Sequence, residues 1–256
     1  MSGAAYSDQY ANCQDSEAVV SEKFVNRLLS SLDAQGVGRL STVMKRVTLK
    51  AQDVLYLPDE RITEIYFPEN CAISMLTIMK NGACIESATV GCEGASWISA
   101  SFRSPTMPCQ TMVAIPGTAY RLPTDAIELE IKKNGRFHNI LSHYSHALLI
   151  QTLRSTACNG LHTVEQRCSR WILATLDRVN LEQFEITQEF LAKLLGVQRT
   201  GITQVIGRLL SEGILTRTER GHIRLGDKEK LEETACECYG IMKKQFSSKY
   251  QVTLTD

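Results

Sequence analysis

Short apolar runs separated by turn residues dominate the chain between positions 43 and 122. Runs of this length, rich in Val, Ile, Thr and aromatic residues and bounded by Pro, Gly, Asn or Asp, are typical of β-strands joined by tight turns. Their number and spacing predict a β-sandwich or jelly-roll barrel over residues 41–123, after an N-terminal arm or helical lead-in over 1–40. The clearest runs are Val47-Thr48-Leu49, Ile65-Tyr66-Phe67, Ile73 to Met79, Ile85 to Val90 and Thr111 to Ile115.

The pattern becomes helical after Pro123, over residues 124–160. A segment from Thr124 to Lys132 and an Asn134-Gly135 break precede a long segment from Arg136 to about Cys158. The long segment is apolar on more than one side, so it needs two packing partners. We expect the β-domain and the same helix of a second chain, which would form a homodimer, while an internal helix of a monomer is the alternative. The predicted dimer contact consists of Phe137, Ile140, Leu141, Tyr144 and Leu148.

Two short helices joined by a glycine turn are predicted between Thr187 and Leu215, in a domain that covers residues 161–256. Thr187 is suited to cap the first helix and Gly196 to end it. The second helix has an apolar stripe from Ile202 to Leu210. Its opposite face carries side chains that can hydrogen-bond to base edges or phosphates, namely Arg199, Thr200, Thr203, Gln204 and Arg208. This pattern indicates a helix-turn-helix, although a helical hairpin in an enzyme core can mimic it.

Charge and the following residues favour a DNA-reading motif. The chain has 28 basic and 28 acidic residues, but 186–225 contains six Lys or Arg against three Glu, a local excess of three positive charges. A Glu219-Arg220-Gly221 turn and the alternating run from His222 to Leu225 predict a β-hairpin wing. A local basic patch in a neutral chain is what a double-stranded DNA partner requires.

These residues resemble the winged helix-turn-helix of the CRP/FNR superfamily of transcription regulators. The resemblance lies in Ile186-Thr187-Gln188-Glu189, in Leu194 to Arg199 and in Arg208 to Leu215. The order of β-domain, long helix and winged helix-turn-helix is also similar to that of the family, over roughly 41–225. The resemblance implies an α+β fold with a cyclic-nucleotide-binding-like β-roll, a long dimerisation helix and a C-terminal winged helix-turn-helix. It also implies a homodimeric regulator with its recognition helix in the major groove, and RNA polymerase as a candidate partner.

By position in the family's motif, the resemblance assigns base reading to Arg199, Thr200 and Gln204, and backbone contacts to Gln188 and Gly201. Thr200 and Gln204 replace the Glu and Arg common in the family, so a different half-site is expected. Gln198 is a weaker cap than the Ser often found there, which leaves the helix start less fixed.

The β-domain departs from the cyclic-nucleotide-binding members of the superfamily. Gly91, Glu93 and Gly94 roughly match the Gly-Glu pair that holds the ribose, with Cys92 interposed. No arginine stands near Met107 to Gln110, where the phosphate would need one, and Arg103-Ser104 lies too early. These three residues are therefore effector-pocket candidates for an unknown effector, cyclic AMP is not expected, and no cofactor is predicted.

The sequence does not show which of the nine cysteines could bind a metal ion or cluster together. An iron-sulfur cluster would need four suitably placed thiolates. The pair Cys236 and Cys238 is interpreted as helix residues, and His143 and His146 as surface or packing residues. No metal site is predicted.

Other classes of protein fit less well. The β-runs contain no histidine that could build a cupin-like catalytic centre, so an enzyme is not expected. The alternative is a signalling adaptor, or a redox or small-molecule sensor, that uses the barrel for protein or ligand binding. No apolar stretch long enough for a membrane span and no signal peptide are present, so a cytoplasmic protein is expected. An extra C-terminal helix is predicted from Lys228 to Tyr250.

Overall fold

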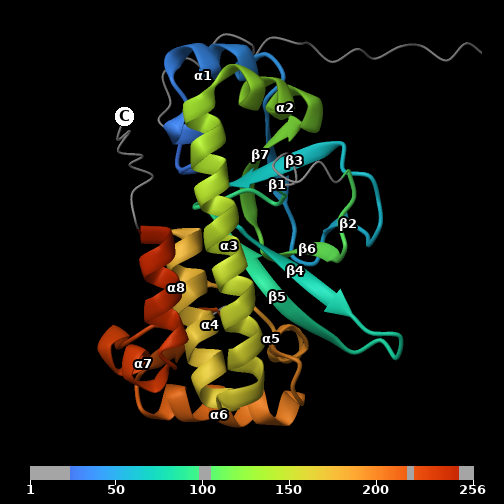
Figure 1. The fold of residues 1–256 in the computed structure, drawn as a ribbon. Helices are drawn as coiled ribbons and strands as arrows, with labels where there is room; N and C mark the ends of the chain where they lie inside the picture. Colours follow the sequence, from blue (N-terminus) through green and yellow to red (C-terminus); the bar gives the residue numbers. More distant parts are fainter. Residues whose placement is uncertain (1–23, 98–104, 218–221, 248–256) are drawn as a thin grey trace, which may run out of the picture.

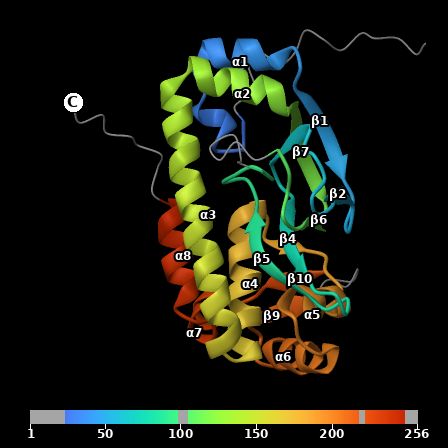
Figure 2. The same ribbon diagram turned by 45° about the vertical axis from the view of Figure 1, so that its right-hand side comes forward.

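A computed structural model describes residues 24–97, 105–217 and 222–247 of the protein. A β-domain and a helical domain are connected by the long helix α3 (Gly135–Leu161), which runs along both (Figures 1 and 2). The predicted N-terminal arm lies mostly outside the described residues. Its described end forms the 3-10 helix η1 (Leu29–Ser31) and the helix α1 (Ala34–Ser41).

The β-domain consists of two antiparallel sheets, as the spacing of the apolar runs predicts. One sheet has the strand order β1-β7-β3 and the other β2-β6-β4-β5. The strands are β1 (Lys45–Leu49), β2 (Val54–Tyr56), β3 (Glu64–Pro68), β4 (Ala72–Ile78), β5 (Cys84–Val90), β6 (Gln110–Ile115) and β7 (Gly117–Pro123). All five predicted runs are strands within one or two residues at each end. The strands β2 and β7 were not among the predicted runs.

Two hydrophobic cores divide the molecule. The first lies within the β-domain and includes Phe67 and Ile73 from the strands and Phe137, Ile140 and Tyr144 from α3. The second lies under the helical domain and also includes side chains of β4 and β6, such as Leu76 and Met112. Because the second core crosses the boundary, the helical domain is packed onto the β-domain rather than tethered beside it.

Local capping explains where the central helices begin. The helix α2 (Thr124–Lys133) ends at Asn134, whose side chain accepts a hydrogen bond of 3.0 Å from the Phe137 backbone and so starts α3. The helix α4 (Val164–Val179) starts with a capping box between Thr163 and Gln166. Such caps satisfy backbone N–H groups that have no partner inside the helix. They therefore fix the break between α2 and α3 and the break between α3 and α4.

The helical domain contains the predicted helix pair and wing. Its elements after α4 are β8 (Gln183–Phe184), α5 (Gln188–Leu195), α6 (Arg199–Ser211), β9 (Leu215–Arg217), β10 (Ile223–Leu225), α7 (Lys228–Thr234) and α8 (Cys238–Ser247). The wing strands pair in the order β8-β10-β9. The tip of the wing, residues 218–221, lies outside the described residues.

The single C-terminal helix predicted from Lys228 to Tyr250 is wrong in one respect. The structure has two helices, because α7 ends at Thr234 and Ala235 adopts an extended conformation. The chain then turns, and α8 packs along α3 (Figure 1). None of the helices in the described ranges combines the length and apolar character that crossing a bilayer requires.

Candidate nucleic-acid interface

The helices α5 and α6 form a helix-turn-helix around a glycine turn. The Thr187 hydroxyl accepts a hydrogen bond of 3.1 Å from the Phe190 backbone and caps α5. Gly196 ends α5 with a φ of +62°, a left-handed conformation that glycine adopts without steric cost. Apolar side chains of both helices enter the second core, so the mutual position of α5 and α6 is fixed by packing. They include Leu191, Leu194 and Leu195 of α5 and Ile202, Ile206 and Leu209 of α6.

The outward face of α6 lies at the end of the molecule farthest from α1 and α2 (Figures 1 and 2). Arg199, Thr200 and Gln204 are exposed on this face. Within the described part of the chain these side chains have no hydrogen-bond or ion-pair partner, so their polar groups are free to meet an external partner. The Gln198 side chain makes no capping bond to α6, as expected from the sequence.

Two other predicted DNA-binding side chains are engaged inside the chain. Thr203 donates a hydrogen bond of 2.8 Å to Gln188 and thereby connects α6 to α5. Arg208 forms ion pairs with Glu165 at 3.1 Å and Glu212 at 2.9 Å. The guanidinium of Arg208 is therefore less available to a phosphate than the sequence suggested. Gly201 is half-buried, with only Val164 near the place where a side chain would project.

The helix α4 and the helix-turn-helix are packed on the β-domain through strand β5. Glu86 is buried and accepts hydrogen bonds from Ser74, from Thr89 at 2.6 Å and from the indole of Trp171 in α4 at 2.9 Å. Burial raises the pKa of the Glu86 carboxyl, although these hydrogen bonds oppose the rise. A side chain added at Gly196 would come within 2.9 Å of Ile85. The turn between α5 and α6 is thus packed tightly against β5.

The effector-pocket candidates occupy a turn that the chain fills with its own side chains. Glu93 pairs with Arg178 of α4 at 2.9 Å, and both side chains are less than a tenth exposed. A side chain at Gly94 would overlap Tyr144 of α3, and one at Gly91 would overlap Arg178. The Glu93 carboxylate is therefore engaged by an arginine of α4, and the assignment of Gly91, Glu93 and Gly94 to an effector pocket stays a prediction. Arg103-Ser104 lies outside the described residues.

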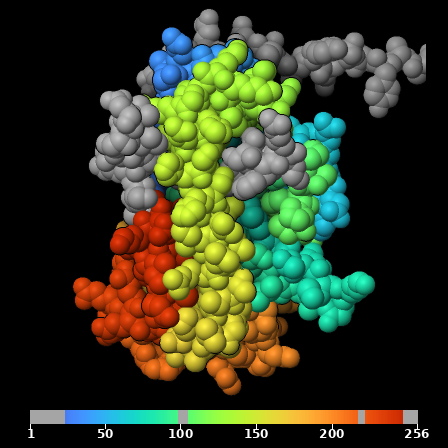
Figure 3. Space-filling model, viewed as in Figure 1, coloured from blue at the N-terminus to red at the C-terminus, as the bar shows by residue number. Residues whose placement is uncertain are grey.

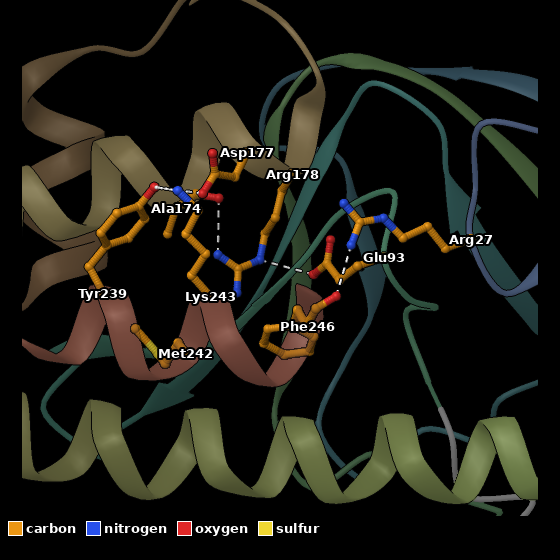
Figure 4. A pocket seen from close by; sticks show the side chains of 9 residues that line it. All are labelled: Arg27, Glu93, Ala174, Asp177, Arg178, Tyr239, Met242, Lys243 and Phe246. Atoms are coloured by element: carbon orange, nitrogen blue, oxygen red, sulfur yellow. Dashed lines mark hydrogen bonds and ion pairs between the residues drawn. The ribbon is translucent and has the colours of Figure 1, made fainter. Parts of the chain in front are cut away.

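A small cavity of about 160 Å³ lies beside this pair, between α4, α8 and the turn after β5 (Figure 4). Its wall carries Arg27, Arg178 and Lys243 together with Glu93 and Asp177. These groups come from segments far apart in the sequence, and no local motif joins them, so sequence reasoning missed the cavity.

The predicted dimer contact also needs correction. Phe137, Ile140, Leu141 and Tyr144 are at most 3% exposed, because they face the β-domain of their own chain. Leu148 is half-buried against the same core. Side chains that are already buried within one chain cannot contribute a surface to a second. The outward face of α3 instead carries Leu149 and Leu153, which are 56% and 61% exposed.

Comparison with known proteins agrees with this architecture. Residues 166–234 match the Crp-like helix-turn-helix domain. The fold is similar to that of FixK2 from Bradyrhizobium japonicum, with a TM-score of 0.62 and 14% identity over 76% of this chain and 98% of that one. It is also similar to the c-di-GMP responsive global regulator CLP of Xanthomonas campestris, with a TM-score of 0.57 and 14% identity over 75% and 99%.

A third similar structure is a transcriptional regulator of the CRP/FNR family from Thermus thermophilus, with a TM-score of 0.55 and 19% identity over 75% of this chain and 98% of that one. A search of curated protein sequences finds no match. Residues 166–234 therefore carry a Crp-like helix-turn-helix domain, and the chain shares the fold of these three structures.

Proposed function

We propose that the protein is a homodimeric, sequence-specific DNA-binding regulator that inserts α6 into the major groove. The observation that carries this proposal is the outward face of α6, where Arg199, Thr200 and Gln204 are exposed and free of partners among the described residues. An α-helix fits the major groove, in which each base pair presents a distinct pattern of donors and acceptors. Unpaired side chains at the end of a rigid helix can read that pattern.

The side chains suggest a half-site chemistry. An arginine fork pairs with O6 and N7 of guanine, and a glutamine amide pairs with N6 and N7 of adenine. We therefore assign a guanine to Arg199 and an adenine to Gln204, with Thr200 contributing a smaller contact. Arg208 has a minor part because its guanidinium is paired with two carboxylates.

The outward face of α3 supports the dimer. Exposed Leu149 and Leu153 lie on the same side as the exposed His146, Thr156 and Ala157. In the space-filling view this side of α3 is uncovered along the helix between α8 and the β-domain (Figure 3). Contact between two copies would remove the leucines from water and relate the two helix-turn-helix motifs by a two-fold axis. Two recognition helices would then enter successive major grooves about 34 Å apart.

Control by cyclic AMP is not part of this proposal. The Glu93 carboxylate is used by Arg178, and a cyclic phosphate would need a cation that the sequence does not supply at the family's position. DNA affinity is therefore expected to be the same with and without cyclic AMP.

A DNA-binding assay with matched variants tests the proposal. The wild-type protein is first used to select duplexes from a random pool, and affinity for a selected duplex is then measured for Arg199→Ala and Gln204→Ala. Each variant should bind about 5- to 150-fold more weakly, since a bidentate base contact contributes about 1–3 kcal/mol. Arg136→Ala, an exposed arginine at the start of α3, is the control and should bind like the wild type.

Unchanged affinity and unchanged base preference in both α6 variants would contradict the assignment of this face. If no duplex is enriched at all, the alternative function becomes the better interpretation. In that case the protein is a signalling adaptor or a sensor that binds a protein or a ligand through its β-domain.

A further inference from the structure

Four metal-ligating side chains meet where the long helix ends and the C-terminal helices turn. Two of them belong to the last turn and the C-cap of α3, and two belong to the junction between α7 and α8. We call them the thiol–imidazole cluster: Cys158, His162, Cys236 and Cys238. Cys158 and Cys236 are 78 residues apart in the chain, so ligand spacing in the sequence could not reveal the cluster.

The ligand atoms of the cluster have the separations that one metal ion imposes. All four lie within 4.8 Å of one another. The sulfurs of Cys158 and Cys236 are 3.5 Å apart, and the sulfur of Cys238 is 3.9 Å from Nδ1 of His162. In a tetrahedral site with Zn–S bonds of about 2.3 Å, two sulfurs lie about 3.8 Å apart, and a sulfur and an imidazole nitrogen about 3.6 Å.

The imidazole is oriented as a ligand by a carboxylate. Nε2 of His162 lies 3.1 Å from a carboxylate oxygen of Glu237, while Nδ1 faces the cysteine sulfurs. A histidine that binds a metal commonly donates its other ring N–H to a carboxylate, which fixes the tautomer and the ring plane.

Burial and charge also favour a bound cation with thiolate ligands. The three cysteines of the cluster are at most 4% exposed, which is the closed setting of a structural site. Two arginines of α4, Arg167 and Arg170, are each 6% exposed and interact electrostatically with Cys158. The Nε atoms of both are buried without a hydrogen-bond partner in the described part of the chain. Three thiolates and one divalent ion carry a net charge of −1, which these buried cations would compensate.

We propose that the thiol–imidazole cluster binds one Zn²⁺ ion in a tetrahedral, closed, structural site. A disulfide between Cys158 and Cys236 would use only two of the four groups and would leave the oriented histidine without a role. A four-iron cluster binds each ligand to a different iron and so holds its ligands farther apart than a single ion does. Cys₃His ligation with closed coordination is typical of structural zinc.

A zinc ion bound by the thiol–imidazole cluster would join α7 and α8 to the break between α3 and α4. From the cluster, α8 runs back toward the β-domain, where the ring of Phe246 lies 6.3 Å from that of Tyr144. The backbone carbonyl of Phe246 also accepts a hydrogen bond of 2.8 Å from Arg27. The ion would therefore fix both the reading domain and α8 relative to α3, and the free energy of metal binding would contribute to folding.

Elemental analysis of the full chain tests this proposal. The protein is purified in reducing buffer without a polyhistidine tag, and its zinc content is measured together with the absorbance after replacement by Co²⁺. About one zinc per chain is expected, with a thiolate-to-cobalt charge-transfer band and intense visible bands of a tetrahedral site. Cys236→Ser and Cys158→Ser should lower zinc affinity sharply, whereas Cys109→Ser, a half-buried thiol of the β-domain, should retain the ion.

A variant of the carboxylate that contacts His162 makes the test independent of folding failure. Glu237→Ala leaves all four ligands in place and should weaken zinc binding about 10- to 100-fold, as loss of such a partner typically does. Folded wild-type protein without zinc, a Cys158–Cys236 disulfide in the reduced preparation, or the absorbance of an iron-sulfur cluster would each overturn the proposal. Equal zinc loss in Cys236→Ser and Cys109→Ser would overturn it as well.

Discussion

Arg178 and Glu93 are 85 residues apart in the chain, yet they form an ion pair in which both side chains are less than a tenth exposed. Arg178 also donates a hydrogen bond of 3.2 Å to Gln151 of α3, whose amide donates to the backbone of Thr89. One arginine therefore connects α4, α3 and the β-domain. No local pattern in the sequence could indicate this, because each partner taken alone is an ordinary charged residue.

Replacing Arg178 by Met should destabilise the fold strongly. The change leaves the Glu93 carboxylate buried without its counter-ion, and breaking a buried pair in this way typically costs about 3–5 kcal/mol. Urea unfolding at neutral pH measures the loss. The control is Lys230→Ala, which removes an exposed ion pair with Asp227 and should change stability by less than about 1 kcal/mol. A loss for Arg178→Met as small as that of the control would show that the pair is not buried in solution.

Glu86 gives a second residue-scale prediction, which concerns pH. Burial raises the pKa of its carboxyl in the folded state above the unfolded value. The folded state then binds more protons, so this group stabilises the fold at low pH and the contribution is lost as pH rises through the raised pKa. Glu86→Gln keeps the size of the side chain and one acceptor oxygen but cannot titrate.

The free energy of unfolding of the wild type relative to Glu86→Gln should therefore fall as pH rises above the unfolded pKa of about 4.3. Urea titrations at several pH values measure this difference. A difference that stays constant or grows with pH would show that Glu86 is not held in a desolvated site.

At the scale of elements, periodicity predicted the helices and most strands but not which side of α3 faces the solvent. Phe137 and Tyr144 are apolar at helical spacing, as a dimer face would be, and they are buried within their own chain. A helix that is apolar on several sides does not reveal which side meets which partner, since that depends on long-range packing. The outward face of α6 was predicted correctly, because its polar residues alternate with one continuous apolar stripe.

The outward face of α3 can be tested separately from its buried face. Leu149→Glu combined with Leu153→Glu should convert the proposed dimer to monomers in analytical ultracentrifugation, because charges would replace apolar contacts across the two-fold axis. Circular dichroism should be unchanged, since both leucines are exposed in the single chain. The buried face responds differently: Phe137→Ala should cost about 3–5 kcal/mol of folding free energy. A double variant that still sediments as a dimer would place the interface elsewhere.

The molecule as a whole couples its parts through the contacts of α4. Trp171 reaches Glu86 of the β-domain, Arg178 reaches Glu93, and the second hydrophobic core includes side chains of β4 and β6. A shift of the β-domain would therefore be transmitted to α5 and α6 through packed side chains. The sequence predicted the order of the domains, but not this docking, because the contacts join residues that are far apart in the chain.

The spacing of half-sites tests the central claim most directly. If two copies related by a two-fold axis each place α6 in the major groove, binding to a palindrome should be strongest when the half-site centres are about 10–10.5 base pairs apart or a multiple of that. Inserting about half a helical turn between the half-sites would turn them to opposite faces of the duplex. We predict that affinity then falls to the level of a single half-site. Equal affinity at every spacing would contradict a dimer that reads successive major grooves.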